Sequence, residues 1–334
     1  MPEINVSHEG NKLKRLTGAV QSKHPAAYLG IAIKTITPIT RSVDRIVRRF
    51  AQQRPSPCLK QVPCAFIVCP PRSGGTVIYQ ALTRALPSVY LSNAHALFPG
   101  LGTWLLDAGR EWPRACELFD NYYGYTAHLL DVYEGNEFFE WAYRDYSKHS
   151  DHGSEHLRRE FERLIGLLSP LPSECVIFKN ARAYSVVERL HRAVPEIVFV
   201  RAKRDRGQVI ESVVRAFREL GYFHPVPDAV REMDVKDPIE FACAQVEAIE
   251  ASLDEQLSHL SSSSRFEISY EAFCERPYEF INTLAYDLLK LSPGSVRNCS
   301  ALAKLRVSRR RKVSDAERSR IQSLIQKGGR EYPL

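Results

Sequence analysis

The stretch from Ile67 to Thr76 most constrains what this chain can fold into. Its apolar start predicts a buried strand, which ends in a turn of unusual composition. The turn is Pro70-Pro71-Arg72-Ser73-Gly74-Gly75-Thr76. Glycines let backbone N–H groups approach an anion, hydroxyls add donors, and a helix beginning near Thr76 directs its positive end into the same space. The alternative is an ordinary turn in which proline and glycine only mark the end of the strand.

The turn does not have the spacing of the phosphate loop of nucleoside triphosphatases. No G-x-x-x-x-G-K-[ST] sequence occurs in the chain, and Arg72 precedes the glycines instead of a lysine following them. Hydrolysis of ATP or GTP is therefore disfavoured, while binding of a phosphate-bearing nucleotide remains the preferred interpretation.

A second segment, residues 196–212, repeats the layout of strand, cationic turn and helix. Its β-branched run predicts a buried parallel strand, and from about Arg206 the pattern becomes helical. Arg204 lies at the crossover, and Ser212 follows about two turns into the predicted helix. Ligands of open parallel sheets bind beyond the carboxyl ends of the strands, so both motifs are expected at one site. Alternatively, the arginines coat a solvated helix start, although cations there oppose the helix dipole.

Both motifs resemble those of sulfotransferases that use 3′-phosphoadenosine 5′-phosphosulfate (PAPS). Residues 71–76 resemble the 5′-phosphosulfate loop, usually P-[KR]-S-G-T-T, with Gly75 in place of the first threonine. Arg204 and Ser212 resemble the 3′-phosphate motif, and residues 266–277 resemble the late strand and helix of the family. The resemblance covers about residues 64–291 and implies PAPS as co-substrate without a metal. The implied donor-binding residues are Arg72, Ser73, Gly74, Gly75, Thr76, Arg204 and Ser212.

The sequence indicates the general base less clearly than the donor-binding residues. Residues 176–181 lack the K-T-H histidine of the cytosolic aryl and steroid enzymes. The chain instead resembles the bacterial carbohydrate-type or tyrosylprotein-type branches, whose base follows the first loop by about twenty residues. His95 is the strong proton acceptor in that window, and an unperturbed imidazole titrates near neutral pH. We therefore predict Arg72 and His95 as catalytic residues. The alternative is that His95 packs in the core, which leaves Asp107 and Glu111 as further candidates.

The order of predicted elements favours an α/β fold. Strands are expected near residues 65–69, 175–178, 197–200 and 266–269, with helices between them. We predict a three-layer parallel sheet of the P-loop nucleoside-triphosphate hydrolase type, with added helices. Residues 1–62 are interpreted as an N-terminal helical extension and linker, and residues 63–334 as the sulfotransferase-like domain. An aromatic helical insertion at about residues 100–170 supplies either core packing or rings for an acceptor pocket.

Composition and charge limit the kinds of ligand and partner that are expected for this chain. The net charge of +7 suits anionic ligands, and the eight cysteines contain no C-x-x-C pair, which favours reduced thiols and a cytoplasmic protein. No stretch is long and apolar enough to span a bilayer. Residues 40–50 predict a basic amphipathic helix that packs on the domain or a partner subunit, with peripheral contact to anionic lipid as the alternative. A homodimer is one possible assembly. The basic run 309–312 is predicted to contact the 3′-phosphate of the bound nucleotide rather than a nucleic acid.

The leading functional interpretation is a sulfotransferase acting on a hydroxyl group of a carbohydrate, lipid-linked or small natural-product acceptor. One alternative is a P-loop-type nucleotide or metabolite kinase, which the absence of the phosphate-loop lysine disfavours. Another is a non-catalytic protein that retains the nucleotide site, an interpretation that the missing K-T-H histidine keeps open. A shared fold does not identify the acceptor.

Overall fold

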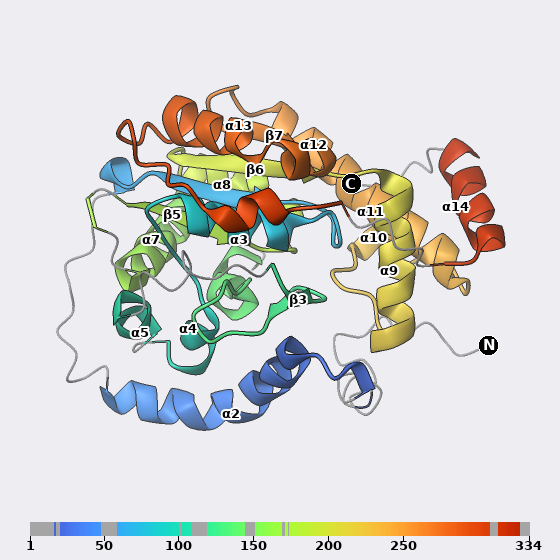
Figure 1. Ribbon diagram of the computed structural model, residues 1–334, viewed down its shortest axis with the longest axis horizontal. Coiled ribbons are helices and arrows are strands. Elements are labelled where there is room, and N and C mark those ends of the chain that lie inside the picture. The colour runs from blue at the N-terminus through green and yellow to red at the C-terminus, as the bar shows by residue number, and fades with distance from the viewer. Residues whose placement is uncertain are drawn as a thin grey trace.

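Five parallel strands form the centre of the structure (Figure 1). The computed structural model describes residues 17, 21–47, 59–99, 102–108, 119–143, 151–168, 171–172, 174–307 and 313–327. The sheet has the order β2-β5-β1-β6-β7. Its strands are β1 (Cys64–Val68), β2 (Ser88–Tyr90), β5 (Cys175–Lys179), β6 (Ile197–Lys203) and β7 (Arg265–Ser269). The predicted α/β class with a parallel sheet is confirmed.

Helices cover both faces of the sheet, as the alternation of side chains along β1 requires. Phe66 and Val68 point into one core with α7 (Asp151–Leu168), α8 (Val187–Ala193) and α11 (Pro238–Ser258). Ala65 and Ile67 point into the other core with α3 (Gly75–Ala85), α12 (Tyr270–Glu275) and the segment Thr283–Leu288. Because β1 and β5 are buried on both faces, their sequences are continuous apolar runs, and this pattern made them predictable.

Strand β2 is the one strand of the sheet that the sequence did not indicate. It has only three residues and pairs with β5 at the edge of the sheet. A segment of three residues carries no measurable alternation, so its strand conformation comes from pairing rather than from its own pattern.

A hairpin and further helices complete the fold. A small antiparallel hairpin joins β3 (Asn121–Tyr122) to β4 (Tyr125–Thr126). The remaining elements are η1 (Leu59–Gln61), α4 (Asn93–Leu97), α5 (Gly102–Ala108), η2 (Asn136–Tyr143), η3 (Ala183–Ser185), α9 (Arg206–Leu220), α10 (Asp228–Arg231), α13 (Pro277–Asn282), η4 (Thr283–Leu288), η5 (Ser300–Lys304) and α14 (Asp315–Lys327).

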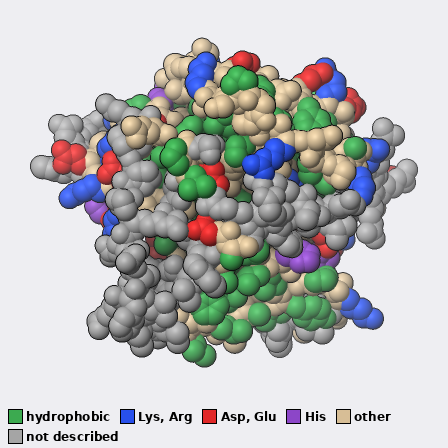
Figure 2. Space-filling model, turned by 60° about the vertical axis from the view of Figure 1, so that its left-hand side comes forward, with side chains coloured by type: hydrophobic (Ala, Val, Ile, Leu, Met, Phe, Trp, Pro, Cys, Tyr) green, Lys and Arg blue, Asp and Glu red, His purple; other side chains and the backbone are tan. Residues whose placement is uncertain are grey.

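The N-terminal helix α2 (Pro25–Val47) lies apart from the sheet, beneath α4 and the hairpin in Figure 1. Its outer side exposes Tyr28, Ile36 and Ile39, and hydrophobic side chains gather along the lower part of the surface in Figure 2. No helix among the described residues is long and apolar enough to cross a membrane. Contact of residues 40–50 with a lipid surface or a second subunit stays a prediction.

Helix α14 packs on α9, the helix that follows β6. Arg318 Nε donates to Glu211 Oε1 at 2.7 Å, and Arg218 pairs with Glu317. The mostly buried Glu211 carboxylate is thereby satisfied. The C-terminal part of the chain thus fixes α9, on which Ser212 lies.

Candidate active site

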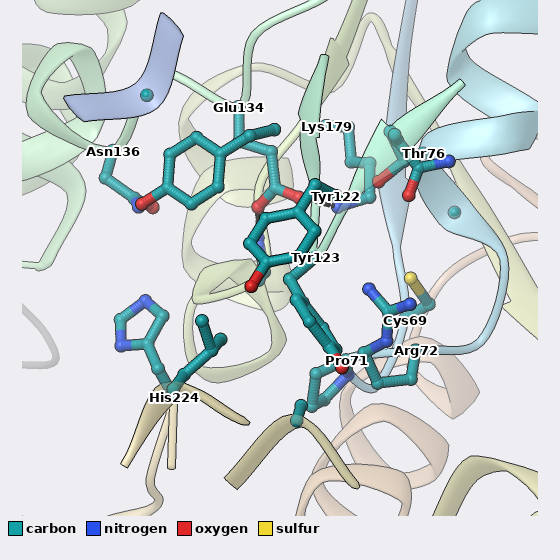
Figure 3. A pocket seen from close by; sticks show the side chains of 18 of the residues that line it. Cys69, Pro71, Arg72, Thr76, Tyr122, Tyr123, Glu134, Asn136, Lys179 and His224 are labelled. Carbon is teal, nitrogen blue, oxygen red and sulfur yellow. Dashed lines mark hydrogen bonds and ion pairs between the residues drawn. The ribbon is translucent and has the colours of Figure 1, made fainter. Parts of the chain in front are cut away.

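A cavity of about 1010 Å³ opens at the carboxyl ends of the strands. Its wall is formed by the loop after β1, the ends of β5 and β6, helix α9, the β3–β4 hairpin and part of α2 (Figure 3). Several residues predicted from the two motifs line it, namely Arg72, Gly74, Gly75, Thr76, Arg204 and Ser212. This is the position at which open parallel sheets bind ligands.

The loop after β1 has a strained backbone. Arg72 adopts φ 71° and Gly74 adopts φ 86°. A left-handed conformation costs a non-glycine residue on the order of 1 kcal/mol or more, and such strain persists where the surrounding structure enforces it. At Gly74 a Cβ atom would lie 2.1 Å from the Tyr270 ring, so only glycine fits there. Glycine at position 74 therefore lets the loop pack directly against the Tyr270 ring, and Gly74 and Gly75 line the cavity with their backbone, as an anion cradle needs.

Arg72 and Arg204 connect the two sequence motifs directly. Arg72 Nε donates to Ser212 Oγ at 3.2 Å, and an Arg204 Nη1–H donates to the Arg72 carbonyl at 3.3 Å. The Arg204 guanidinium also lies over the Tyr270 ring, 4.7 Å from its centroid. The structure thus brings together residues 132 and 140 positions apart, as the two motifs predicted.

Positive charge converges on this part of the cavity. Burial lowers the pKa of Arg72, and the neighbouring Arg204 and Arg215 lower it further. Arg204 Nε is buried and has no hydrogen-bond acceptor within the described part of the chain, and it lies 4.0 Å from Glu271 Oε1 in a long ion pair. Since clustered buried cations are stabilised by an anion among them, the residues present fit a phosphate or sulfonate group.

Ser73 behaves differently from its neighbours in the loop. Its side chain is only 1% exposed and is not among those that line the cavity. Its N–H donates to the Pro70 carbonyl at 3.4 Å, which closes the turn. The position of Ser73 therefore supports a role in shaping the loop.

The departure at Gly75 has a structural cause. A Cβ atom there would lie 2.6 Å from Cys69 Sγ and 2.7 Å from Lys179 Cε. Both side chains line the cavity, and Lys179 extends from the end of β5 past the start of α3. The sulfotransferase loop usually has threonine at the position of Gly75. In this chain the Lys179 side chain occupies the space that a threonine side chain would need.

Glu134 lies next to Lys179 in the wall of the cavity, and the two form a salt bridge (Figure 3). The backbone N–H of Ala181 also donates to Glu134 Oε2 at 3.3 Å, while the Asn180 amide donates to the Glu134 carbonyl at 3.2 Å. These contacts fix a carboxylate beside the loop after β1. The sequence offered only a weak signal for it, a carboxylate between Tyr133 and Gly135 inside the aromatic stretch.

The structure does not bring His95 to this site. The side chain is fully buried on the short helix α4 and is not among the lining residues of the cavity. Its Nδ1 accepts the backbone N–H of Ser92 at 3.1 Å and lies 2.9 Å from Ser92 Oγ, which caps α4. Burial lowers the pKa of His95 to about 3. These features correct the expectation that His95 faces the transferred group and instead give it a structural position.

Of the two reserve candidates, the structure describes only Asp107. Asp107 lies on α5 and is not a lining residue, and Glu111 lies outside the described residues, as does the run 309–312. Among the described residues, no group of three or more histidine, cysteine, aspartate or glutamate side chains is placed to hold a metal ion.

The aromatic insertion divides between core and cavity. Phe139 and Trp141 are buried against the sheet, where Phe139 contacts Phe66 and Phe178. Four tyrosines line the cavity instead: Tyr122, Tyr123, Tyr125 and Tyr133. The centroid of the Tyr123 ring lies 4.9 Å from the Arg72 guanidinium carbon, so this ring packs on the side chain of the loop after β1. Core packing is therefore confirmed for part of this set, and contact of the cavity-lining rings with an acceptor stays a prediction.

Comparisons with known proteins agree with this geometry. The sequence model of the sulfotransferase family matches residues 63–291. Sulfotransferase STF1 from Mycobacterium tuberculosis is 14% identical, with 96% of this chain and 87% of that chain covered and a TM-score of 0.51. Sulfotransferase STF9 from Mycobacterium avium is 13% identical, with coverages of 98% and 81% and a TM-score of 0.48. No curated protein sequence matches the chain.

The similarity to STF1 shows a shared fold, since identity at this level carries no further assignment. The family match covers 229 residues of the 334-residue chain and includes both phosphate motifs and the pair Lys179 and Glu134. By this match, the chain belongs to the sulfotransferase family.

Proposed function

We propose that this protein transfers the sulfuryl group of PAPS to a hydroxyl group of a carbohydrate, lipid-linked or small natural-product acceptor. The hydrogen bond from Arg72 to Ser212 carries the proposal, because it unites the two phosphate motifs in one wall. A nucleotide phosphorylated at both its 5′ and 3′ positions is the ligand that needs both motifs.

The donor-binding roles follow from the positions of the side chains. Gly74, Gly75 and Thr76 form the start of α3, whose N-terminal N–H groups suit the 5′-phosphosulfate. Arg204 and Ser212 suit the 3′-phosphate, and Arg72 lies between the two groups through its contact with Ser212.

We assign the general base to Glu134 rather than to His95. Sulfuryl transfer joins the acceptor oxygen to sulfur and breaks the bond between sulfur and the 5′-phosphate oxygen. The acceptor proton passes to a carboxylate oxygen of Glu134, which lines the cavity next to the loop. Lys179 holds that carboxylate and, with Arg72, supplies positive charge where the departing phosphate oxygen becomes negative.

The proposal is tested by calorimetric titration of the protein with adenosine 3′,5′-bisphosphate and with ATP, followed by turnover assays with radiolabelled PAPS. Tight binding of the bisphosphate and weak binding of ATP are expected. Equal affinities would contradict the donor assignment. Bisphosphate binding without sulfuryl transfer to any member of a hydroxyl acceptor panel would favour the non-catalytic alternative. The match to the sulfotransferase family disfavours the alternative that the protein is a kinase.

A further inference from the structure

Helix α2 forms part of the cavity although it precedes the segment that matches the family. Gly30, Ile33 and Thr37 line the cavity, and their spacing of three and four places them on one helix face. The same face is fastened to the domain, because Thr37 Oγ1 lies 3.3 Å from the Ala96 carbonyl it contacts on α4. The inner side of α2 is therefore a wall of the site.

Contacts with the β3–β4 hairpin fix the position of this wall. A Cβ atom at Gly30 would lie 3.0 Å from Cδ1 of Tyr125, so the absence of a side chain lets the ring pack against the helix. Just before the helix, His24 Nε2 lies 2.8 Å from Asp120 Oδ1, and its ring is 5.6 Å from the Tyr122 ring. Helix and hairpin thus hold each other at two points.

Helix α2 lies in the half of the cavity away from the donor loop. In Figure 3 its blue ribbon passes on the side of Asn136, whereas Cys69 and Arg72 lie across Tyr122 and Tyr123. Tyr123 packs on Arg72, so the hairpin separates the phosphate cradle from the half that α2 closes. That second half is where an acceptor must enter.

Three carboxylates that line the cavity are engaged by protein groups. Glu134 pairs with Lys179, Glu137 accepts the Tyr133 hydroxyl at 3.0 Å, and Glu219 accepts from Arg215 at 2.6 Å. The lining also holds other polar side chains, among them Asn121, Asn136, Glu140 and His224. Beside them the wall offers a surface of rings and apolar side chains, namely Tyr122, Tyr125, Tyr133, Phe223 and Ile33. Surfaces of this kind bind flat, apolar rings.

We propose that α2 sets acceptor selectivity, with Ile33 and the contact between Gly30 and Tyr125 shaping a slot for a hydroxyl carried on a flat aromatic ring. This inference rests on the proposed sulfuryl transfer and narrows its acceptor class. Ile33 is 6% exposed and lines the slot, whereas Ile36 on the same helix is 42% exposed and is not a lining residue. The two isoleucines provide a matched pair for a test.

The test uses the full-length chain and 2-naphthol as the probe. Its binding is measured by fluorescence in the presence of adenosine 3′,5′-bisphosphate, and its sulfation is measured with PAPS. Ile33→Trp is expected to weaken binding and lower kcat/KM by about tenfold or more, because a bulky side chain fills the slot. Ile36→Trp should leave both unchanged, and neither substitution should alter the affinity for the bisphosphate.

Gly30→Ala covers the case in which Ile33→Trp fails to fold. Alanine favours a helix over glycine, so the melting temperature should not fall, yet the added methyl group pushes Tyr125 and should weaken 2-naphthol binding. Equal effects of the two tryptophan variants, or no binding of 2-naphthol by the wild type, would overturn the inference. Failure of the wild type to bind the bisphosphate would instead count against the proposed function.

Discussion

Arg72 Nε lies 3.2 Å from the hydroxyl oxygen of Ser212 on α9, two turns into the helix that follows β6. This contact holds the strained loop after β1 against the second motif. The two motifs therefore lie side by side in one wall of the cavity.

Arg204→Ala should weaken adenosine 3′,5′-bisphosphate at least tenfold while hardly affecting adenosine 5′-monophosphate. A charge-assisted hydrogen bond contributes about 1.5 to 3 kcal/mol, and only the bisphosphate offers the 3′-phosphate to Arg204. Calorimetric titration of both nucleotides measures the difference. Lys203→Ala is the control, because Lys203 pairs with Glu267 at 2.7 Å and does not line the cavity. Equal losses for both nucleotides would remove the 3′-phosphate assignment.

Arg72→Gly should separate stability from activity. Glycine tolerates φ 71° without strain, so the melting temperature should not fall. Turnover should drop by about a hundredfold or more, because the positive charge beside the transferred group is lost. Calorimetric melting and a PAPS turnover assay measure the two effects. Arg72→Lys keeps a charge and should retain more activity than Arg72→Gly, and wild-type turnover by the glycine variant would refute the role.

Glu134→Gln should lower turnover by about a hundredfold to ten-thousandfold if this carboxylate accepts the acceptor proton. The amide keeps the shape of the side chain but cannot serve as the base, so the affinity for adenosine 3′,5′-bisphosphate should stay near the wild-type value. Glu137→Gln is the matched control in the same cavity, since Glu137 binds the Tyr133 hydroxyl. Comparable losses in both variants would point to a general disturbance of the cavity.

His95 should influence stability and its pH dependence rather than catalysis. Burial lowers its pKa from 6.5 to about 3, so the unfolded state binds a proton that the folded state excludes. The free energy of unfolding should therefore decrease as the pH falls below about 6.5 toward 3. His95→Gln should flatten this dependence in denaturant titrations and leave turnover per folded molecule unchanged at neutral pH. Loss of turnover in a folded variant would return His95 to the catalytic candidates.

The sequence determined four of the five strands of the sheet and the position of the two motifs at its edge. The apolar runs of β1, β5 and β6 are buried on both faces, so a local pattern sufficed to locate them. The turns after β1 and β6 follow from residues adjacent in the chain, and parallel strands place their carboxyl ends at one edge. The meeting of Arg72 with Ser212 was predictable for this reason.

Only the tertiary structure decided the remaining walls of the cavity. Glu134 reaches Lys179 across 45 positions of sequence, and α2 meets Tyr125 across almost a hundred, through docking of segments with no shared local pattern. His95 is a further example. Its distance from the first loop in the sequence predicted a general base, but in the fold it is buried and caps the start of α4. Side-chain surroundings depend on which elements pack together, and single-sequence patterns report periodicity and turn chemistry but not that packing.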